Sequence, residues 1–505
     1  MQGKNIGQIL GIILGVIVAI YAVVAIILNP TGGISGLSKL ITILGVIIGI
    51  INPKAGLYFL VVQAVYCDEV KRVGVYYGVQ STQTVSEILI GPLLTLCALN
   101  ISFLHGILRR QYKIDLLGWV LYALTPIVAA ILLIKGRGDG LVLNIYLAGT
   151  TSAYLTLIPI CYGVFNTFQD WVKLVSSQVI VAAPAAAWGI WQYFNGFNQI
   201  EWGYALSGLS RVHSVQMMME EPRIFGLFGS ASALGCVGMY GIFSFWRGAH
   251  YRKGRWGYML LALVYFVVTV LSHQRSLLLF PIIVLVFSLA FRRKVTTILL
   301  YGSAFLVLVL GILNATYLRE EGIEKIDGLI IGESRWSRNV MSVSTFSDRL
   351  MGWERLTRPE TWSLFGTEKE LTSSIVKSSI NPDYQSSDYS HDIINRILIN
   401  FGAVGLCATL LLAGIILYQL HNVIFRCKTS EQRKEGAFVM ACIVPVLILS
   451  FMGGDNFSTT PINLQTWSIF AGIFVLKRTS MNSSPPPTQR VPYPSRGNPT
   501  PALAS

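Results

Sequence analysis

Two short stretches of the chain combine basic or titratable side chains with strongly apolar flanks. LSHQRSLLLF carries Arg275, and SHDIINRILINF carries His391, Asp392 and Asn395. In a helix, His391 and Asn395 would share one face because they are four residues apart. The imidazole of His391 titrates near neutral pH and can take a proton from a hydroxyl group. Arg275 offers a fork of donors that matches phosphate oxygens.

Two further arginines lie in segments of related character. Arg349 and Trp353, in FSDRLMGWERL, have helical spacing, and Arg223 lies just before the small-residue sequence GLFGSASALG. Together with Arg275 and His391, these arginines suit a diphosphate leaving group beside an acceptor hydroxyl that must lose its proton. The residue types therefore predict transfer chemistry on a diphosphate substrate.

Each of these side chains also has a simpler interpretation. Arg275 can anchor a helix end at the membrane interface, and His391 can snorkel or cap a helix. Arg349 can lie in an ordinary amphipathic loop helix, and Arg223 can pair with a neighbouring glutamate. The functional interpretation depends on all four residues lying on the same side of a membrane.

The elements that must position these side chains are predicted to be membrane-spanning helices. Of the 505 residues, 53% are hydrophobic and only 13% are charged, and apolar runs of about 20 residues recur along the chain. We predict an all-α integral membrane protein with twelve to fourteen transmembrane helices, the range arising from one short run at 56–67. The predicted spans are 6–28, 34–51, 56–67, 87–105, 116–134, 141–165, 174–193, 224–246, 257–273, 276–291, 296–314, 396–420, 437–452 and 462–476.

The distribution of charge predicts how these helices are oriented. Five short basic connections hold 16 Lys and Arg residues and enclose two Glu residues, whereas residues 315–390 carry 9 basic and 12 acidic residues. Cytoplasmic loops are enriched in Lys and Arg, so both termini are predicted inside and the long segment outside. The net charge of +14 follows this pattern, and nucleic acid is therefore not an expected partner.

The chain divides into four predicted parts. The long outer segment contains Trp336, Trp353 and Trp362, which favour a folded cap over a solvated tether. The Pro- and Ser-rich end of the chain is predicted to be disordered. The parts are transmembrane helices at 1–314 with an outer loop at 194–223, a large outer cap at 315–395, C-terminal transmembrane helices at 396–478, and a disordered cytoplasmic tail at 479–505.

Four pieces of sequence occur in an order that resembles the O-antigen ligase and polymerase superfamily of bacterial envelope glycosyltransferases. The resemblance covers about residues 180–425. The sequence departs from the family pattern at Asp392, where the family usually has Asn, at GTE instead of Gly-x-Gly, and at GSAS instead of a Pro–Asn pair. The four pieces are GIWQYFNGFNQIEWGYALSG with RIFGLFGSASALG, then SHQRSLLLF, then DRLMGWERL with LFGTE, and finally SHDIINRILINFGAVGL.

The resemblance implies a metal-independent transferase of multi-span fold that uses no cofactor. Its donor would be an oligosaccharide on a polyprenyl diphosphate at the outer leaflet of a bacterial inner membrane, with the active site in the large periplasmic loop region. Arg275 and Arg349 would hold the diphosphate, and His391 would activate the hydroxyl of a lipid or glycan acceptor. The further candidates for substrate binding are Arg223, Trp353, Asp392 and Asn395.

Other functions remain open at the level of sequence. A ligase and a polymerase of this superfamily differ only in the acceptor. A transporter of the same lipid-linked glycans would be marked by repeated halves and charged cavities within the membrane. A membrane scaffold would use the outer loop to bind protein. The seven cysteines form no CxxC motif and no cluster with histidine, so a zinc site and a disulfide framework are not expected.

Overall fold

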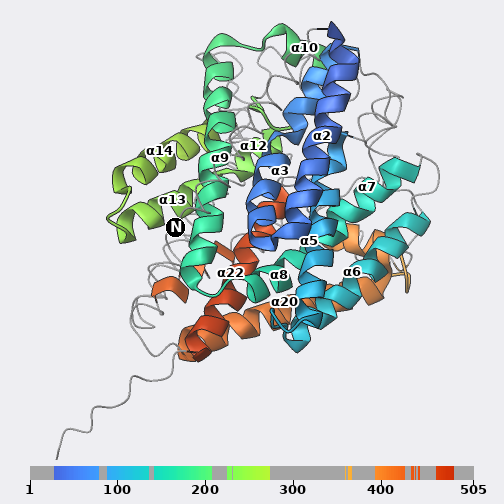
Figure 1. Cartoon of the computed structure of the whole chain (residues 1–505), viewed down its shortest axis with the longest axis vertical. Coiled ribbons are helices and arrows are strands. Elements are labelled where there is room, and N and C mark those ends of the chain that lie inside the picture. The colour runs from blue at the N-terminus through green and yellow to red at the C-terminus, as the bar shows by residue number, and fades with distance from the viewer. Residues whose placement is uncertain are drawn as a thin grey trace, which may run out of the picture.

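The computed structural model describes an all-helical protein in which several of the long helices run side by side along the long axis of the molecule and others cross them obliquely (Figure 1). Every regular element within the described ranges is a helix, which confirms the predicted all-α fold. The described residues are 28–78, 88–135, 141–206, 224–229, 231–272, 359, 362–366, 393–426, 434–436, 438–439, 442–443 and 462–482.

Five helices within these ranges are long and apolar enough to cross a membrane. A helix of about 20 apolar residues spans the hydrocarbon core of a bilayer, so these five confirm a multi-pass membrane protein. The five spans lie in α2 (Pro30–Ile51), α5 (Gly91–Leu108), α6 (Leu116–Lys135), α9 (Phe168–Asn195) and α20 (Ile393–Arg426).

A single residue joins α2 to α3 (Pro53–Tyr76). The backbone N–H of Asn52 donates to the carbonyl of Ile48 at the end of α2. The side-chain oxygen of Asn52 accepts from the backbone N–H groups of Lys54 and Ala55 at the start of α3, at 3.0 and 3.2 Å. Asn52 therefore caps both helices, and it makes α2 and α3 a tight hairpin that packs on α5.

The predicted bounds of the short third span, 56–67, are wrong. The helix that contains these residues, α3, is 24 residues long and ends at Tyr76. The predicted span ended at the charged sequence DEVKR, residues 68–72, which hydropathy alone excludes from a membrane helix. In the structure Asp68, Lys71 and Arg72 are each at most 3% exposed. Their charges are paired inside the protein, and α3 continues without a break past these residues.

The span predicted at 141–165 is interrupted. It consists of α7 (Leu141–Ser152), a 3-10 turn (Ala153–Thr156) and α8 (Leu157–Val164). Pro159 has no N–H to donate to the carbonyl of Leu155, which favours a break one turn before the proline. The hydroxyl of Thr156 also donates back to the carbonyl of Ala153 and accepts from the amide of Asn100 on α5.

Helix α9 is the centre of the packed core. It begins with a capping box between Thr167 and Asp170. The fully buried ring of Trp171 donates through Nε1 to the carbonyl of Ser468 on α22 (Ile462–Asn482), at 2.7 Å. Gln178, also fully buried, donates to the hydroxyl of Ser468 and accepts from that of Tyr240 on α13 (Gly238–His250). α14 (Arg255–Leu271) packs on α13 and α9.

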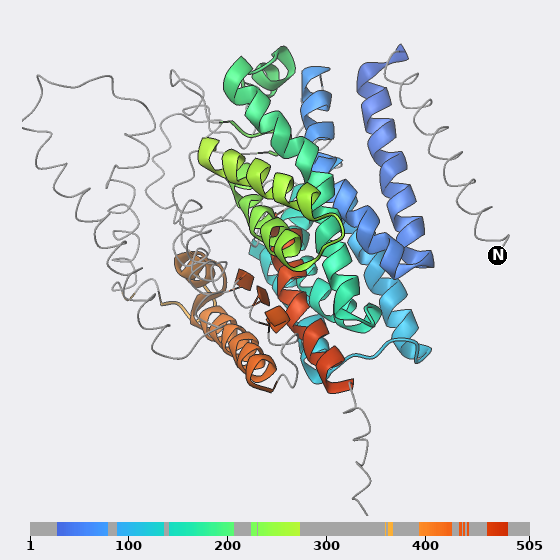
Figure 2. The ribbon, with the colours of Figure 1, turned by 90° about the vertical axis from the view of Figure 1, so that its left-hand side faces the viewer.

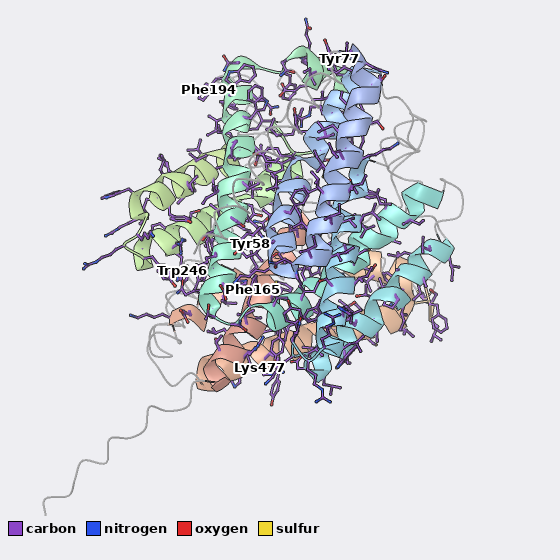
Figure 3. All side chains as sticks on the ribbon, in the orientation of Figure 1. Tyr58, Tyr77, Phe165, Phe194, Trp246 and Lys477 are labelled. Atoms are coloured by element: carbon purple, nitrogen blue, oxygen red, sulfur yellow. The ribbon has the colours of Figure 1, made fainter. Side chains whose placement is uncertain are left out.

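The two ends of the molecule carry different side chains. Figure 3 places Tyr77 and Phe194 at one end, called here the Phe194 end, and Lys477 toward the opposite end, called the Lys477 end. The short helix α10 (Gln199–Leu206) lies across the Phe194 end, after α9 (Figure 1). At the Lys477 end, the guanidinium of Arg478 donates to carbonyls of Tyr162 and Gly163 and so fixes α22 to α8.

The eighth predicted span, 224–246, is wrong in its first part. Residues 224–229 form a non-helical turn, followed by α12 (Ala231–Cys236) and α13. The late helix α20 lies beside α22 (Figure 2) and covers the predicted span 396–420, but its backbone is broken at Gly402. α22 continues to Asn482 and so includes the first four residues, 479–482, of the predicted tail.

Some predictions lie outside the described residues. They are the spans 6–28, 276–291 and 296–314, most of the span 437–452, nearly all of the cap 315–395, and the tail beyond 482. The number of twelve to fourteen spans therefore stays a prediction, as does the folded cap.

Candidate functional site

The residues predicted for chemistry fall mostly outside the described ranges. Asn395 lies in the first turn of α20, where only its backbone is described. The structure does describe segments close to Arg223 and to His391, together with the LFG sequence at 364–366. The predicted residues outside the described ranges are Arg223, Arg275, Arg349, Trp353, His391 and Asp392.

The LFG sequence, residues 364–366, contacts the helix that follows His391. The backbone N–H groups of Ala403 and Val404 donate to the carbonyls of Ser363 and Leu364, at 2.9 and 3.2 Å. Between the two halves of α20, Gly402 has φ 66° and ψ −163°, which no helix contains. The break frees N–H groups that a continuous helix would use internally, and the loop carbonyls accept from them. We call this contact the loop–helix joint.

Only glycine fits at the centre of the loop–helix joint. A Cβ atom at residue 402 would collide with the carbonyl oxygens of Ser363 and Leu364 and with the backbone nitrogen of Gly366. The positive φ of Gly402 also belongs to the left-handed region that other residues avoid. The glycine of SHDIINRILINFGAVGL therefore allows the LFG segment to pack directly against the helix backbone.

A second contact joins the segment 189–206 to the turn 224–229. The side chain of Gln192, near the end of α9, accepts from the backbone N–H groups of Phe225 and Gly226 at 3.1 and 2.7 Å. Its amide group donates to the carbonyl of Gly226 and to Glu201 of α10, at 3.2 and 2.6 Å. Gln192 is 2% exposed, so these hydrogen bonds form away from water.

Helix α3 holds the same turn from the other side. The guanidinium of Arg72 donates to the carbonyls of Gly226 and Phe228, at 3.0 and 2.8 Å. The carboxylate of Asp68 accepts from the backbone N–H of Gly229 at 3.0 Å. Arg72, Asp68 and Gln192 thus hold the turn with side chains from two helices, and we call these three residues the polar clamp.

The charges around the polar clamp are paired. Arg72 lies 3.0 Å from Glu69 and 3.9 Å from Glu201, and Lys71 lies 3.1 Å from Asp68. The five charges sum to −1, from three carboxylates and two cations. Glu201 also accepts from the indole N–H of Trp188 and the backbone N–H of Asn198. Such pairing offsets part of the cost of removing these groups from water.

Two aromatic rings complete the surroundings of Arg72. Its guanidinium lies 4.6 Å from the ring centre of Phe225 and 5.7 Å from that of Tyr204, while the ammonium of Lys71 lies 4.9 Å from the Tyr204 ring. Both rings are fully buried. Cations above aromatic faces are stabilised electrostatically, so the rings substitute for water around the two cations.

Sequence reasoning missed the polar clamp, although a signal was present. In DEVKR each acid stands three residues before a base, Asp68 before Lys71 and Glu69 before Arg72. Pairs with this spacing lie on the same face of a helix and can neutralise one another. Four charged residues paired in this way, directly after an apolar run, indicate a buried ionic cluster as well as the end of a span.

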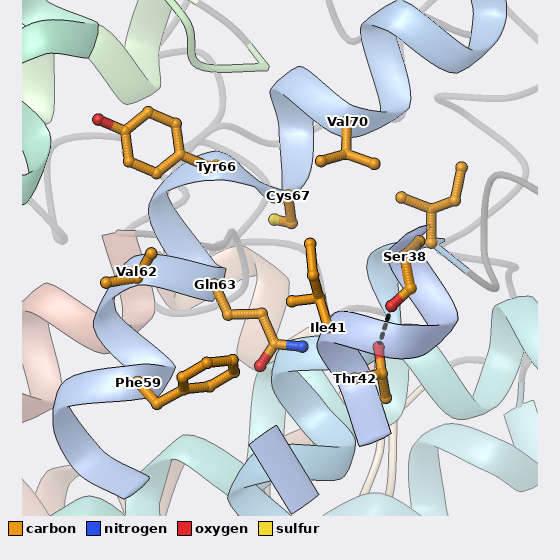
Figure 4. Close-up of a pocket in the computed structure, with 10 residues that line it drawn as sticks. Ser38, Ile41, Thr42, Phe59, Val62, Gln63, Tyr66, Cys67 and Val70 are labelled. Atoms are coloured by element: carbon orange, nitrogen blue, oxygen red, sulfur yellow. Dashed lines mark hydrogen bonds between the residues drawn. The ribbon is translucent and has the colours of Figure 1, made fainter. Parts of the chain in front are cut away.

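A hollow between α2 and α3 has a different character (Figure 4). The hydroxyl of Thr42 donates to the carbonyl of Ser38 on its wall, and Gln63 accepts from Thr95 nearby. None of the described residues that line the hollow is charged. Its walls therefore lack the cations that a diphosphate requires.

The described helices define the protein as a multi-pass helical membrane protein. Comparisons of the chain with models of protein families, with curated proteins and with solved structures found no match.

Proposed function

We propose that the protein is a membrane glycosyltransferase that moves a glycan from a polyprenyl diphosphate carrier to an acceptor hydroxyl, at the outer face of a bacterial inner membrane. The observation that carries the proposal is the loop–helix joint. It brings together two of the sequence motifs that resemble the ligase and polymerase superfamily, LFGTE and the segment that begins at His391, which are separated along the chain. A transfer site built from both motifs requires this proximity.

The proposed reaction is a single displacement at the anomeric carbon of the donor sugar. The acceptor oxygen forms a bond to that carbon while the bond from the carbon to the diphosphate oxygen breaks. The electron pair of the broken bond leaves with the polyprenyl diphosphate, and the proton of the acceptor hydroxyl passes to His391. One displacement inverts the configuration of the anomeric carbon.

Charge development explains the proposed roles of the two arginines. Negative charge grows on the departing diphosphate in the transition state, and donors already aimed at its oxygens stabilise that charge strongly in a partly dehydrated site. Arg275 and Arg349 would provide these donors, and Arg223 would add a third cation. Asp392 and Asn395 would orient His391 and the acceptor, and Trp353 would contact the donor.

The acceptor divides the proposal into two forms. A ligase would transfer the glycan to a lipid or protein, whereas a polymerase would transfer it to another lipid-linked repeat unit. The ligase form is the leading one, and the length of the product distinguishes it from the polymerase form.

The test is glycan transfer by the purified protein in lipid bilayers, given a polyprenyl-diphosphate oligosaccharide and a panel of candidate acceptors. Wild type is compared with His391→Ala, Arg275→Ala and Arg349→Ala, each first shown to be folded. We expect transfer by wild type, undiminished by EDTA, and a loss of about a hundredfold or more in each variant. Undiminished transfer in all three folded variants would refute the assigned site. Movement of the lipid-linked glycan across the bilayer without transfer would instead identify a transporter.

A further inference from the structure

The turn 224–229 engages the backbone N–H groups of residues 225 to 229 in hydrogen bonds within the protein. The N–H groups of Phe225 and Gly226 donate to Gln192, and that of Gly229 donates to Asp68. The two between them donate to carbonyls, Leu227 to Ala185 and Phe228 to Phe225. Every backbone N–H from 225 to 229, all of them described, is therefore engaged within the protein. These amides cannot cradle a phosphate, although glycine-rich turns often do so.

The turn is also fixed by close packing. A Cβ at Gly226 would lie 2.5 Å from the carbonyl oxygen of Ala185, and Gly226 has a positive φ of 60°. A Cβ at Gly229 would lie 2.6 Å from the carboxylate of Asp68. Ile224, the first described residue of the turn, is buried. Close packing at Gly226 and Gly229 and the burial of Ile224 therefore hold the backbone of this turn in place.

We infer that Gln192, Arg72 and Asp68, the polar clamp, are positioning residues for Arg223, the residue bonded directly to Ile224. The inference rests on the proposed function, in which Arg223 binds the diphosphate of a polyprenyl donor. The clamp holds the turn, the turn fixes the point where the chain leaves Ile224, and the donor contact is made by the side chain rather than by the turn amides. No member of the clamp needs to touch the donor.

The chain offers a matched control on the same helix. Gln178 and Gln192 both lie on α9, and both are buried and hydrogen-bonded. Gln178 joins α9 to α13 and α22, whereas Gln192 holds the turn. Gln178→Met and Gln192→Met therefore remove the same amide from the same helix. Only the second is expected to release the turn.

The first measurement is backbone hydrogen exchange of the full-length protein in bilayers. We expect Gln192→Met to increase exchange at 225–229 selectively, while α5 stays protected and Gln178→Met leaves 225–229 as in wild type. Arg72→Lys, which keeps the charge but loses the fork to two carbonyls, is expected to act like Gln192→Met and serves if that variant does not fold. The inference would be overturned if exchange at 225–229 were unchanged in both Gln192→Met and Arg72→Lys. It would also be overturned if these variants raised exchange equally at 225–229 and in α5.

The second measurement is binding of undecaprenyl diphosphate. We expect Gln192→Met to weaken binding about tenfold and Gln178→Met to leave it within twofold. In an Arg223→Ala background, Gln192→Met should have no further effect, because the clamp acts through Arg223. Equal losses in both backgrounds would overturn the inference. If the wild-type protein binds no undecaprenyl diphosphate, the proposed function is refuted, and with it the role of the polar clamp in donor binding. Hydrogen exchange would still decide whether the polar clamp holds the turn.

Discussion

The backbone N–H of Ala403 donates a hydrogen bond to the carbonyl of Ser363 across 2.9 Å, and so links the segment 362–366 to the break in α20 at Gly402. The two residues are 40 positions apart, and His391 lies on the chain between them. The hydrogen bond therefore joins the two ends of the stretch of chain that carries His391, the proposed base.

Gly402→Ala is expected to disrupt this link. The new methyl group would collide with two loop carbonyls, and alanine at φ 66° adds about 1–2 kcal/mol of backbone strain. We expect a lower unfolding temperature and a large loss of glycan transfer. Gly414→Ala on the same helix is the control, because outside its own helix no described atom lies within 4 Å of the added Cβ. Thermal unfolding and transfer assays in lipid would show equal behaviour of the two variants if the joint were unimportant.

The ion pair between Lys71 and Asp68 should reveal itself in a double-mutant cycle. Both side chains are buried, so Lys71→Met leaves the Asp68 carboxylate without its cation and should cost about 3–5 kcal/mol. Adding Asp68→Asn removes that charge and keeps an oxygen for the N–H of Gly229, so the double variant should recover much of the loss. Denaturant unfolding in detergent measures each free energy. Additive losses would mean that the two charges do not depend on one another.

Trp171→Phe is expected to loosen the contact between α9 and α22. The substitution deletes the hydrogen bond to Ser468 inside the core and should lower the free energy of unfolding by about 1–2 kcal/mol. Trp119→Phe, at a ring that is 48% exposed on α6, should change it by less than about 0.5 kcal/mol. Unfolding curves of the two variants decide the matter, and an equal effect would contradict the importance of the indole N–H.

The orientation of the protein can be tested by labelling single cysteines. The charge pattern predicts that the Phe194 end faces outward and the Lys477 end faces the cytoplasm. The variants are made in a background without natural cysteines, and a membrane-impermeant maleimide is added to intact spheroplasts, in which the outer face of the inner membrane is accessible. Asn195→Cys should react with this reagent. Lys477→Cys should react only after the membrane is opened. The reverse pattern would invert the proposed topology and place the polar clamp on the cytoplasmic side.

The apolar spans could be predicted from sequence because hydropathy reports them directly. α2, α5 and α6 occupy the predicted runs to within a few residues. Hydropathy failed where a charge is neutralised by a distant partner. Arg72 is held by carbonyls more than 150 residues further along the chain, and a window of 20 residues contains no trace of them.

The candidate site was predictable only as motifs. The spacing in SHDIINRILINFGAVGL indicated a helix, but it gave no sign that Gly402 breaks that helix to receive the loop. Likewise, IFGLFG reads as apolar enough to begin a span, whereas its glycines instead form the turn held by Gln192. In both places the backbone departs from a helix because a tertiary partner supplies its hydrogen bonds, and such partners are not encoded by local pattern.

The shared cap at Asn52 has a consequence for biosynthesis. With α2 and α3 joined by Asn52 alone, no loop separates the two helices as they emerge from the ribosome. α3, with its charged quartet, does not qualify as an independent span, whereas α2 does. The pair would therefore enter the membrane together, with α3 drawn in by its apolar neighbour. Lys71 and Arg72 of α3 would gain their contacts with α10 and with the turn 224–229 only after those segments have been synthesised. The polar clamp therefore cannot be complete before residue 229 has been added to the chain.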